Sequence, residues 1–394
     1  MAVDKIKIVR IIARLNIGGP AVNASILSSS LDEKIFSTKA VYGSLAEGEG
    51  SLEHIMREQN VDMELVPELG REISPFGDIK AFFGILGIIR REKPDIVHTH
   101  TAKAGTLGRL AAALCGVKVK IHTFHGNVFE HYFGPVKTAL FIRVERFLGL
   151  FTDKVVVLSE RQKDDIAKKF RIVPETKCAV IPLGVDLSRL NAAGSVSGDL
   201  RKELSIDGSA VLVGIIGRLV PIKNHIMLIN AAAEVRRRRP ELNVRFIIAG
   251  DGELSGVIKS LARSLGIEED VHFLGWRNDL ASLYKALDIV ALTSLNEGTP
   301  LVLIEAMACA RPVIATDVGG VSDIVEDGAN GILVKKNDLT GFAEGLIRLI
   351  EDRGLRERLG SVGLKRSAYF SKDNLVKNMT KLYMECVKAK GKKL

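Results

Sequence analysis

A pair of glutamates flanks a predicted helix start in the stretch SLNEGTPLVLIEA, which covers residues 294–306. Thr299 is a suitable helix N-cap, and Pro300 suits the first helical position, where its missing N–H is not needed. Glu297 then lies in the loop before the helix, and Glu305 lies inside the helix. At the helical rise per residue, the two carboxylates stand on the order of 8–10 Å apart along the axis.

The start of this predicted helix also provides an anion site. Its first backbone N–H groups have no partner within the helix and lie at the positive end of the helix dipole. The residues concerned are Gly298, Thr299, Leu301 and Val302. The stretch therefore offers an acceptor, an anion site and a second acceptor, which matches the sugar hydroxyls, diphosphate and ribose hydroxyls of a nucleotide-sugar. An ordinary loop–helix junction explains the same spacing equally well.

Two cations follow another predicted strand, in the stretch GIIGRLVPIKNH. Arg218 and Lys223 lie five residues apart at the carboxyl end of that strand. Two cations at this place suit a diphosphate that leaves carrying additional negative charge. The alternative is a pair of surface cations without a ligand.

A glycine pair follows the first predicted strand, in the stretch RLNIGGPAVN. Gly18 and Gly19 permit a tight turn in which a phosphate can approach the backbone closely, and Pro20 then begins a helix. The pattern is not G-x-G-x-x-G, so a dinucleotide site is only weakly indicated. A plain tight turn remains the alternative.

Histidines end neighbouring predicted strands, at positions His98, His100, His122 and His125. His125 precedes a glycine and is the histidine that we expect to face a ligand. A zinc site is conceivable from the number of histidines, but they lack an ordered ligand spacing and an acidic partner. No D-x-D pair stands at a strand end to hold a divalent cation against a diphosphate. The sequence therefore favours a site without a metal ion or other cofactor.

The stretch GWRNDL lies upstream of the glutamate stretch and places Trp276 and Arg277 just after a predicted strand. The backbone of these two residues could meet the base of a nucleotide. Simple packing of Trp276 is an equally good explanation. Both residues are candidates for donor binding.

The elements that must hold these residues alternate between apolar strands and helices. Continuous apolar strands with helices between them are typical of parallel sheets covered on both faces. The predicted strands of the first half are Ile6–Ile12, Thr38–Tyr42, Asp62–Val66, Ile96–His100, Lys118–Thr123, Lys154–Leu158 and Cys178–Ile181. Those of the second half are Val211–Ile216, Val244–Ala249, Val271–Leu274, Ile289–Leu292, Pro312–Ala315 and Ile332–Val334.

A turn-rich stretch at residues 182–200 separates the two halves. We therefore predict two Rossmann-like, doubly wound α/β domains that face a cleft, at residues 1–183 and 184–370. A C-terminal helix with a basic tail, residues 371–394, is expected to cross back to the first domain. Ligands of such folds bind beyond the carboxyl ends of the strands, so the cleft is the expected site.

Composition places the chain among globular proteins. Its 394 residues suffice for two domains, and 46% of them are hydrophobic while 26% are charged. No stretch reaches the ~18–20 apolar residues of a membrane-spanning helix, and the start of the chain lacks a secretory pattern. The four cysteines show neither metal nor disulfide spacing. These features favour a reducing, cytoplasmic location.

The formal net charge of +9 comes largely from the run Arg236–Arg239 and from the lysine-rich C-terminus. Such runs are either solvated surface or contacts for anionic lipid or a phosphate-bearing substrate. Nucleic acid is not an expected partner, because the chain has no zinc finger, basic zipper or RNA-binding aromatic strand motif.

Residues 133–154 predict an amphipathic helix with an apolar stripe and several cations. The stripe consists of Leu140, Phe141, Val144, Phe147, Leu148 and Phe151. The cations are Lys137, Arg143, Arg146 and Lys154. One interpretation packs the stripe on the sheet of the first domain. The other places it against anionic lipid at the inner face of the plasma membrane, which would suit a lipid-linked acceptor.

Several of these stretches together resemble the family-4 glycosyltransferases. The stretches are GRL with its following lysine, EGTPLVLIEAMA, PVIATDVGG and VEDGANGILV, joined by the glycine pair and the FHG segment of the first half. The resemblance covers nearly the whole chain and is strongest over residues 211–334. Two departures are Ala310, where many relatives have glycine, and PIKNH in place of the commoner PEKG. Lys223 keeps its place in the latter.

The resemblance implies the glycosyltransferase B fold, with the donor bound mainly by the second domain. It also implies transfer of a sugar from a nucleotide-sugar, with UDP favoured, with retention of configuration and without a metal ion. The implied acceptor is a glycan or a lipid-linked molecule of cell-surface polysaccharide or glycolipid synthesis.

Roles for single residues follow from the same resemblance. Glu297 is implied to hold hydroxyls of the donor sugar, and Glu305 the ribose. Arg218 and Lys223 are implied to neutralise the diphosphate, helped by the N–H of Gly19.

The resemblance places His125 beside the donor sugar. No carboxylate is placed as a nucleophile, so we expect a front-face reaction in which the leaving diphosphate accepts the proton of the acceptor. Two other classes remain open at this point. One is a nucleotide-sugar epimerase of related fold, and the other is a non-catalytic membrane- or polymer-binding module.

Overall fold

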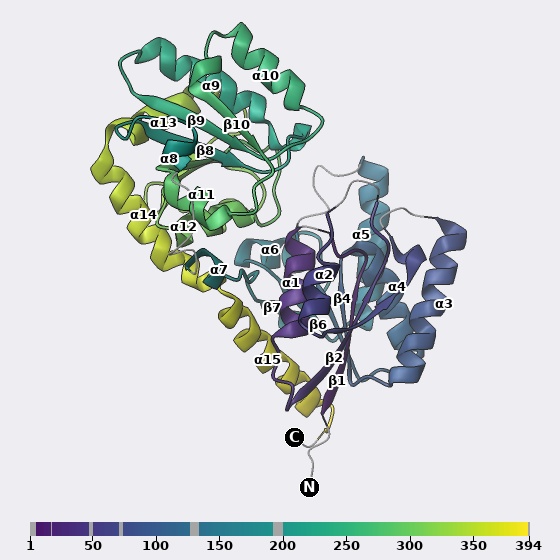
Figure 1. Cartoon of the computed structure of the whole chain (residues 1–394). Coiled ribbons are helices and arrows are strands. Elements are labelled where there is room, and N and C mark those ends of the chain that lie inside the picture. The colour runs from purple at the N-terminus through teal and green to yellow at the C-terminus, as the bar shows by residue number, and fades with distance from the viewer. Residues whose placement is uncertain are drawn as a thin grey trace. The chain divides into compact units, whose positions relative to one another are not determined.

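The computed structural model describes residues 5–16, 18–46, 50–70, 74–126, 134–191 and 200–392. These residues form two compact units, each built on a parallel sheet (Figure 1). The first unit takes residues 1–184 together with residues 372–394, and the second takes residues 185–371. The prediction of two doubly wound α/β domains is confirmed.

In the described residues, the first unit has a seven-stranded sheet with the order β3-β2-β1-β4-β5-β6-β7. Its strands are β1 (Ile6–Ile12), β2 (Phe36–Tyr42), β3 (Asp62–Leu65), β4 (Ile96–His100), β5 (Val119–Thr123), β6 (Lys154–Val157) and β7 (Cys178–Val180). Its helices are α1 (Gly19–Ser29), α2 (Glu53–Glu58), α3 (Pro75–Glu92), α4 (Ala102–Leu114), α5 (Pro135–Leu150), α6 (Glu160–Asp164) and α15 (Lys372–Ala389). Short helical turns occur at Pro67–Leu69, Asp165–Lys169 and Glu175–Lys177. The strand order reverses between β1 and β4, so the ligand crevice of this unit is expected at their carboxyl ends.

The first sheet is buried on both faces. Val9 of β1 packs with residues of α3 and α4, whereas Ile8 packs on the opposite face. That opposite face is covered by α1 and α15, and α15 contributes Leu375, Met379 and Tyr383 to the core. The prediction that the C-terminal helix returns to the first domain is thereby confirmed.

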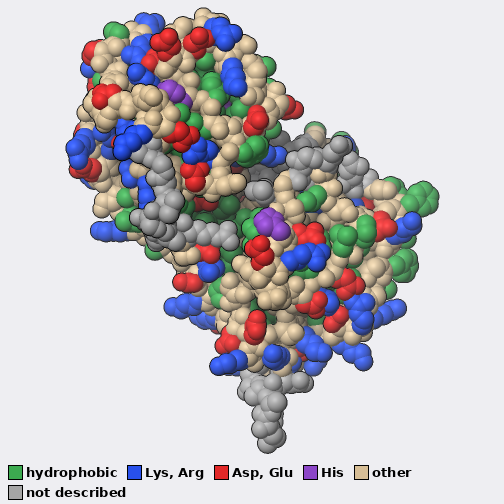
Figure 2. Space-filling model, viewed as in Figure 1, with side chains coloured by type: hydrophobic (Ala, Val, Ile, Leu, Met, Phe, Trp, Pro, Cys, Tyr) green, Lys and Arg blue, Asp and Glu red, His purple; other side chains and the backbone are tan. Residues whose placement is uncertain are grey.

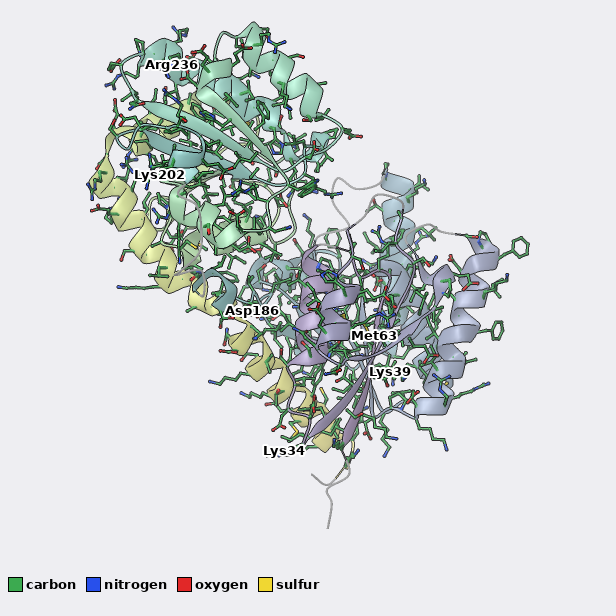
Figure 3. All side chains as sticks on the ribbon, viewed as in Figure 1. Lys34, Lys39, Met63, Asp186, Lys202 and Arg236 are labelled. Atoms are coloured by element: carbon green, nitrogen blue, oxygen red, sulfur yellow. The ribbon has the colours of Figure 1, made fainter. Side chains whose placement is uncertain are left out.

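Charged side chains line the edge of the first sheet. Figure 3 shows Lys39 on β2 and Met63 on the neighbouring edge strand β3. Lys39 Nζ lies 2.9 Å from the carboxylate of Asp62, its partner in the register, and 3.6 and 3.5 Å from those of Glu64 and Glu92. Charges on an edge strand discourage pairing with other chains. The ammonium group of Lys39 is therefore paired with neighbouring carboxylates at the edge of the sheet.

The helix α5 presents apolar side chains on two sides. Leu148 is buried, and Phe141 packs against a core cluster below the helix. The large apolar side chains that the helix exposes to solvent are Val136, Leu140, Phe147 and Leu150. The prediction of one continuous stripe is wrong, because its members divide between the core and the solvent. Phe133, where the predicted helix begins, lies outside the described residues.

In the described residues, the second unit has a six-stranded sheet with the order β10-β9-β8-β11-β12-β13. Its strands are β8 (Val211–Ile216), β9 (Val244–Ala249), β10 (Val271–Gly275), β11 (Ile289–Leu292), β12 (Val313–Thr316) and β13 (Gly331–Val334). Its helices are α7 (Ser188–Asn191), α8 (Leu200–Glu203), α9 (His225–Arg238), α10 (Ser255–Ser264), α11 (Leu280–Ala286), α12 (Leu301–Ala308), α13 (Leu339–Glu351) and α14 (Arg353–Ser367). Short helical turns occur at Pro221–Lys223, Glu268–Asp270 and Ala368–Phe370. Here the order reverses between β8 and β11.

The boundaries of several elements differ from the prediction. β2 begins at Phe36 rather than Thr38, and β12 runs over Val313–Thr316 rather than Pro312–Ala315. The predicted linker at residues 182–200 contains the short helix α7, while its residues 192–199 lie outside the described part of the chain. These shifts do not move any strand to another place in the order.

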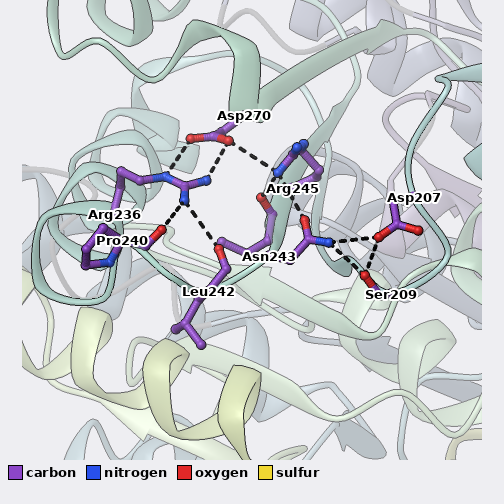
Figure 4. A network of polar contacts seen from close by, with 9 residues as sticks. Asp207, Ser209, Arg236, Pro240, Leu242, Asn243, Arg245 and Asp270 are labelled. Atoms are coloured by element: carbon purple, nitrogen blue, oxygen red, sulfur yellow. Dashed lines mark hydrogen bonds and ion pairs between the residues drawn. The ribbon is translucent and has the colours of Figure 1, made fainter.

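The basic run Arg236–Arg239 is neutralised within the second unit. Arg236 donates to both oxygens of Asp270 at 2.9 and 2.6 Å and to the backbone carbonyls of Pro240 and Leu242 (Figure 4). The other ion pairs of the run are Arg237–Glu234, Arg238–Glu234, Arg238–Glu344, Arg239–Glu241 and Arg239–Glu351. The interpretation as a solvated, locally paired surface is therefore favoured over an anion-binding patch.

Candidate functional site

Two loops meet at the point where the strand order of the second unit reverses. One follows β8 and carries Arg218 and Lys223, and the other follows β11 and carries Glu297. β8 and β11 are neighbours in the sheet and run parallel. Their carboxyl ends therefore lie at the same edge, which is the usual ligand position in an open α/β sheet.

An ion pair joins these two loops. Lys223 Nζ lies 2.6 Å from Glu297 Oε1, and Ser294 Oγ donates to the same oxygen at 2.6 Å. The side chains of Lys223 and Glu297 are 25% and 10% exposed. Thr293 Oγ1 lies 3.1 and 2.9 Å from the backbone carbonyls of Lys223 and Asn224, which fixes the loops to each other. Two predicted site residues are thus brought together, by partners in Ser294 and Thr293 that the sequence had not indicated.

A glycine pair after β12 packs against the backbone of the Glu297 loop. Gly320 N–H donates to the carbonyl of Glu297 at 3.1 Å, and Gly319 has a left-handed backbone with φ of +54°. A Cβ atom on Gly319 would lie 1.9 Å from the carbonyl oxygen of Glu297, and one on Gly320 the same distance from that of Gly298. Only glycine permits this approach. The signal that could have identified them is a glycine pair that follows a strand after two residues.

The helix α12 begins one residue later than predicted. Pro300 is its N-cap, with ψ of 103°, and no side chain caps the helix, so the prediction of Thr299 as N-cap is wrong. The extended backbone of Pro300 places the proline before the first turn rather than in it. Leu301 and Val302, both partly exposed, therefore open the helix and present N–H groups without a partner inside it.

Glu305 is held by a buried tyrosine. The hydroxyl of Tyr284, a fully buried residue of α11, donates to Glu305 Oε2 at 2.7 Å. Burial raises the pKa of Glu305, and the hydrogen bond from Tyr284 opposes that shift. Glu305 is therefore oriented by a dedicated partner, which argues against a stray acid on a buried helix. The role of Tyr284 was missed, because nothing in the sequence ties it to Glu305.

Trp276 and Arg277 follow β10, as predicted, but differ in environment. The side chain of Trp276 is 66% exposed, so its packing into the core is excluded. Arg277 donates to Asp279 and Glu203, each at a shortest distance of 2.7 Å, and these bonds raise its pKa. The guanidinium of Arg277 is thus occupied, and the backbone remains the part that could meet a base.

Arg218 differs from the arginines of the basic run. Its side chain is exposed at the end of β8, and it forms no ion pair with any residue that the structure describes. A cation of this kind, on the same loop as Lys223, suits a polyanionic ligand.

The remaining predicted residues lie in the first unit. Gly18 is the N-cap of α1, and Gly19 and Pro20 form the first turn of that helix. The backbone of Gly18 is extended, with φ of −179°, and a Cβ atom there would meet only Asn16 Nδ2 at 3.8 Å. A tight turn is therefore not what requires glycine at position 18. With glycine at positions 18 and 19, no side chain caps the start of α1.

The four predicted histidines divide between the two faces of the first sheet. His98 and His100 share the α15 face with His125, and His100 Nδ1 lies 2.8 Å from His125 Nε2. His122 lies on the other face, 2.8 Å from Thr99 Oγ1. Burial lowers the pKa of His125 to about 3 and lowers those of the other three well below their usual value. These imidazoles are therefore neutral at physiological pH. Over the described ranges, no three His, Cys, Asp or Glu side chains are grouped to hold a metal ion.

Two family models match consecutive parts of the chain. Residues 47–189 match the model described as Glycosyltransferase Family 4, and residues 197–366 match the model described as Glycosyl transferases group 1. The matched ranges contain the histidines of the first unit and all of the predicted site residues of the second. Gly18 and Gly19 precede both ranges.

Individual proteins show the same similarity. The chain is 34% identical over 292 residues to the UDP-Gal:alpha-D-GlcNAc-diphosphoundecaprenol alpha-1,3-galactosyltransferase of Escherichia coli, covering 74% of this chain and 75% of that protein. It is 33% identical over 330 residues to the D-inositol 3-phosphate glycosyltransferase of Salinispora arenicola, covering 77% and 73%. Among solved structures, HepE of Anabaena in complex with UDP superposes with a TM-score of 0.80 at 22% identity, covering 96% of this chain and 100% of that one. This last similarity concerns the fold.

Proposed function

Since the chain belongs to the family-4 glycosyltransferases and has their glycosyltransferase B fold, we propose that it moves a sugar from a UDP-sugar to a glycan or lipid-linked acceptor of the cell surface. The observation that carries the proposal is the Lys223–Glu297 pair, which joins the loop that carries the exposed Arg218 to the loop that leads into α12. The matching relatives are named as transferases, so neither the epimerase nor the non-catalytic module is pursued.

The relatives support the choice of donor and acceptor. The Escherichia coli relative is named for a UDP-galactose donor and a diphosphoundecaprenol-linked acceptor. HepE of Anabaena has been solved with UDP-glucose. We assign a UDP-sugar to this chain on that basis, and an acceptor that is a glycan or carries a lipid diphosphate.

Each site residue is assigned to one part of the donor. Arg218, Lys223 and the first N–H groups of α12 lie against the diphosphate, because all three are donors at one edge of the sheet. An ammonium group has three protons to donate, so Lys223 can keep its bond to Glu297 while it binds a phosphate oxygen. Glu297 accepts from hydroxyls of the sugar, and Glu305 accepts from the ribose.

The proposed reaction retains the configuration at the anomeric carbon. The bond from that carbon to the diphosphate breaks, and the acceptor oxygen bonds to the same face. The acceptor hydroxyl gives its proton to the departing diphosphate, so no protein base is needed. Arg218 and Lys223 stabilise the charge that builds up on the leaving group, which is the work that a divalent cation does in other enzymes.

Metal independence is the direct test of this mechanism. With a UDP-sugar and a lipid-linked acceptor, we expect acceptor-dependent release of UDP at the same rate in excess EDTA as without it. NMR of the product should show a new linkage with the anomeric configuration of the donor. Loss of the rate in EDTA with recovery on adding magnesium or manganese would contradict the mechanism, and turnover of the donor without any acceptor would contradict transfer.

We further propose that the first unit binds anionic membrane through α3 and α5. α4 contacts both helices, so the three cover the same face of the sheet. The large apolar side chains exposed on α3 are Phe76, Ile79 and Phe83, and Figure 2 shows hydrophobic side chains standing out where α3 lies in Figure 1. Together with the exposed apolar residues of α5 they form the outer apolar surface.

The charges of α5 fit the same orientation. Its only acid, Glu145, points inward and forms a buried ion pair with Arg109 at 2.7 Å. Lys137, Arg143 and Arg146 are exposed around the outer apolar surface. The outer side of α5 therefore combines apolar contact with positive charge only, as in interfacial helices. Within the described residues, no helix is both long and apolar enough to cross a membrane.

This surface predicts weak, salt-sensitive binding to anionic vesicles. Each basic residue near such a surface is worth about 1 kcal/mol, and salt screens that attraction. The chain should sediment with anionic vesicles at low salt, less at high salt, and not with neutral vesicles. The double variant Phe76→Ser/Phe83→Ser should lose most of this binding. Val257→Ser, at a side chain of α10 that is 52% exposed, serves as the matched control. Absence of sedimentation at low salt would refute the surface.

A further inference from the structure

An arginine without an acid partner lies inside the first unit. Arg10 of β1 is fully buried, and its guanidinium donates to Ser28 Oγ at 3.0 Å and to the carbonyl of Leu27 at 3.1 Å. Its Nη1 faces His98 Nδ1 at 3.0 Å, Tyr383 Oη at 3.1 Å and His100 Nε2 at 3.4 Å. No carboxylate is among these partners. A buried charge is costly unless it is paired, so its retention at this position calls for a reason.

The contacts continue from Arg10 to the carboxyl end of β5. His100 Nε2 faces Arg10, and His100 Nδ1 lies 2.8 Å from His125 Nε2. The rings of His100 and His125 are stacked with centroids 5.1 Å apart. His125 Nδ1 is buried and has no hydrogen-bond partner among the described residues. A chain of three side chains therefore leads from the core to an unpartnered nitrogen.

The direction of each hydrogen bond in this chain follows from Arg10. A guanidinium can only donate, so His100 Nε2 must accept. A neutral imidazole that accepts at one nitrogen carries its proton on the other, so His100 Nδ1 donates to His125 Nε2. By the same rule, the proton of His125 is on Nδ1. The unpartnered nitrogen is therefore a donor.

We propose that Arg10 is a positioning residue that fixes His125 in the tautomer with its proton on Nδ1, through His100. Resting on the proposed function, we expect that N–H to donate to an acceptor oxygen of a substrate. A buried donor without a partner is rare in folded proteins, which is what a ligand contact in the complex would explain. A carboxylate in place of Arg10 would accept a hydrogen bond from His100 Nε2 and would therefore favour the opposite tautomer. This accounts for a cation at position 10.

A second branch from Arg10 provides an internal comparison. Tyr383 Oη accepts from Arg10 Nη1 at 3.1 Å, and its own proton goes to His98 Nδ1 at 2.6 Å. His98 Nε2 then donates to Thr123 Oγ1 at 2.7 Å. This branch ends inside the core and does not reach His125. Cutting it should disturb the packing to a similar degree without altering the His125 tautomer.

Nitrogen NMR of the full chain labelled with ¹⁵N-histidine tests the proposal without any turnover. The two ring nitrogens of His125, assigned with a His125→Gln sample, should show the proton on Nδ1 in the unsubstituted chain at neutral pH. In Arg10→Met, the signals should move toward the other tautomer or a mixture. The proton found on Nε2 in the unsubstituted chain would overturn the proposal, even if Arg10→Met does not fold.

Kinetics give the second readout. In Arg10→Met we expect turnover at saturating UDP-sugar to fall about 10²-fold, as misorientation of a contacting group can produce. The KM for the donor should stay within threefold. Thr123→Val, which cuts only the other branch, should keep turnover within threefold and keep the Nδ1 tautomer. Equal losses in both variants would overturn the positioning role. A chain with the expected tautomer but no transferase activity would refute the proposed function and leave the tautomer assignment standing.

Discussion

Replacing Lys223 by methionine or Glu297 by glutamine lowers turnover at saturating donor by on the order of 10²–10³-fold, the usual cost of losing one charge-stabilising group at a reacting centre. The two side chains share a bond of 2.6 Å and lie at the edge of the sheet where β8 and β11 end. Both remain partly exposed, so each substitution should leave the fold intact. Turnover and circular dichroism, measured on the same samples, separate the loss of activity from loss of structure.

The double variant sharpens this expectation. Because Lys223 and Glu297 are in contact, their effects should not be additive, and the double variant should lose less than the product of the single losses. Arg236→Met is the matched control, since it removes an arginine from an ion pair in the same unit. Its partner Asp270 lies at the amino end of β10, where no ligand is proposed. The Arg236→Met variant should keep turnover within twofold. If either single variant keeps more than half of the activity, the assignment of the site is wrong.

Substituting Gly319 by alanine should be nearly as damaging. The added Cβ would lie 1.9 Å from the carbonyl oxygen of Glu297, and the backbone at this position is left-handed. The Glu297 loop must move to make room, and a displacement of about 1 Å at a reacting centre can cost 10²-fold in rate. We therefore expect a fall of about that size in turnover, together with a lower affinity for UDP measured by calorimetry.

Gly328→Ala separates displacement of the loop from backbone strain. Gly328 also has a left-handed backbone, with φ of +73°, but a Cβ atom there would meet nothing within 4 Å. The two variants should therefore share the strain of a left-handed alanine, while only Gly319→Ala moves Glu297. Similar turnover in both variants would show that the glycine pair does not support the site.

The strands were predictable because their physical cause is local. The run at Val211–Ile216 is apolar throughout, and the run at Ile6–Ile12 is apolar apart from Lys7 and Arg10. A parallel strand is buried on both faces, so an apolar run marks where such a strand lies. The start of α12 was predicted one residue too early. Proline suits both the residue before a helix and its first turn, and only the backbone angle of Pro300 distinguishes the two.

Periodicity could not tell which side of α5 faces the sheet. Apolar residues occur around most of the helix, so a stripe drawn through Leu140 and Leu148 joins an exposed side chain to a buried one. A pattern along the sequence gives the period of a helix. Which side of the helix faces the sheet depends on the side chains of the sheet that pack against it.

The candidate site was only partly predictable for a related reason. Strand ends and a helix start point to Arg218, Lys223, Glu297 and Glu305, because their chemistry stands next to recognisable local structure. The residues that support them do not stand next to such local structure. Tyr284 meets Glu305 from another helix, and Tyr383 reaches Arg10 across 373 residues of sequence. Such contacts exist only once the sheets have formed, and no spacing in the chain records them.

The return of α15 to the first unit reverses the order in which the two units can be completed during synthesis. The second unit is one continuous segment, so all of its strands and helices have been made by residue 371. The first unit begins with β1 but lacks Leu375, Met379 and Tyr383 until α15 has left the ribosome. Domains generally fold as units when their chain becomes available. The half that is translated first is therefore the half that completes its core last. Until α15 has been made, the guanidinium of Arg10 lacks the hydroxyl of Tyr383 as a hydrogen-bond partner.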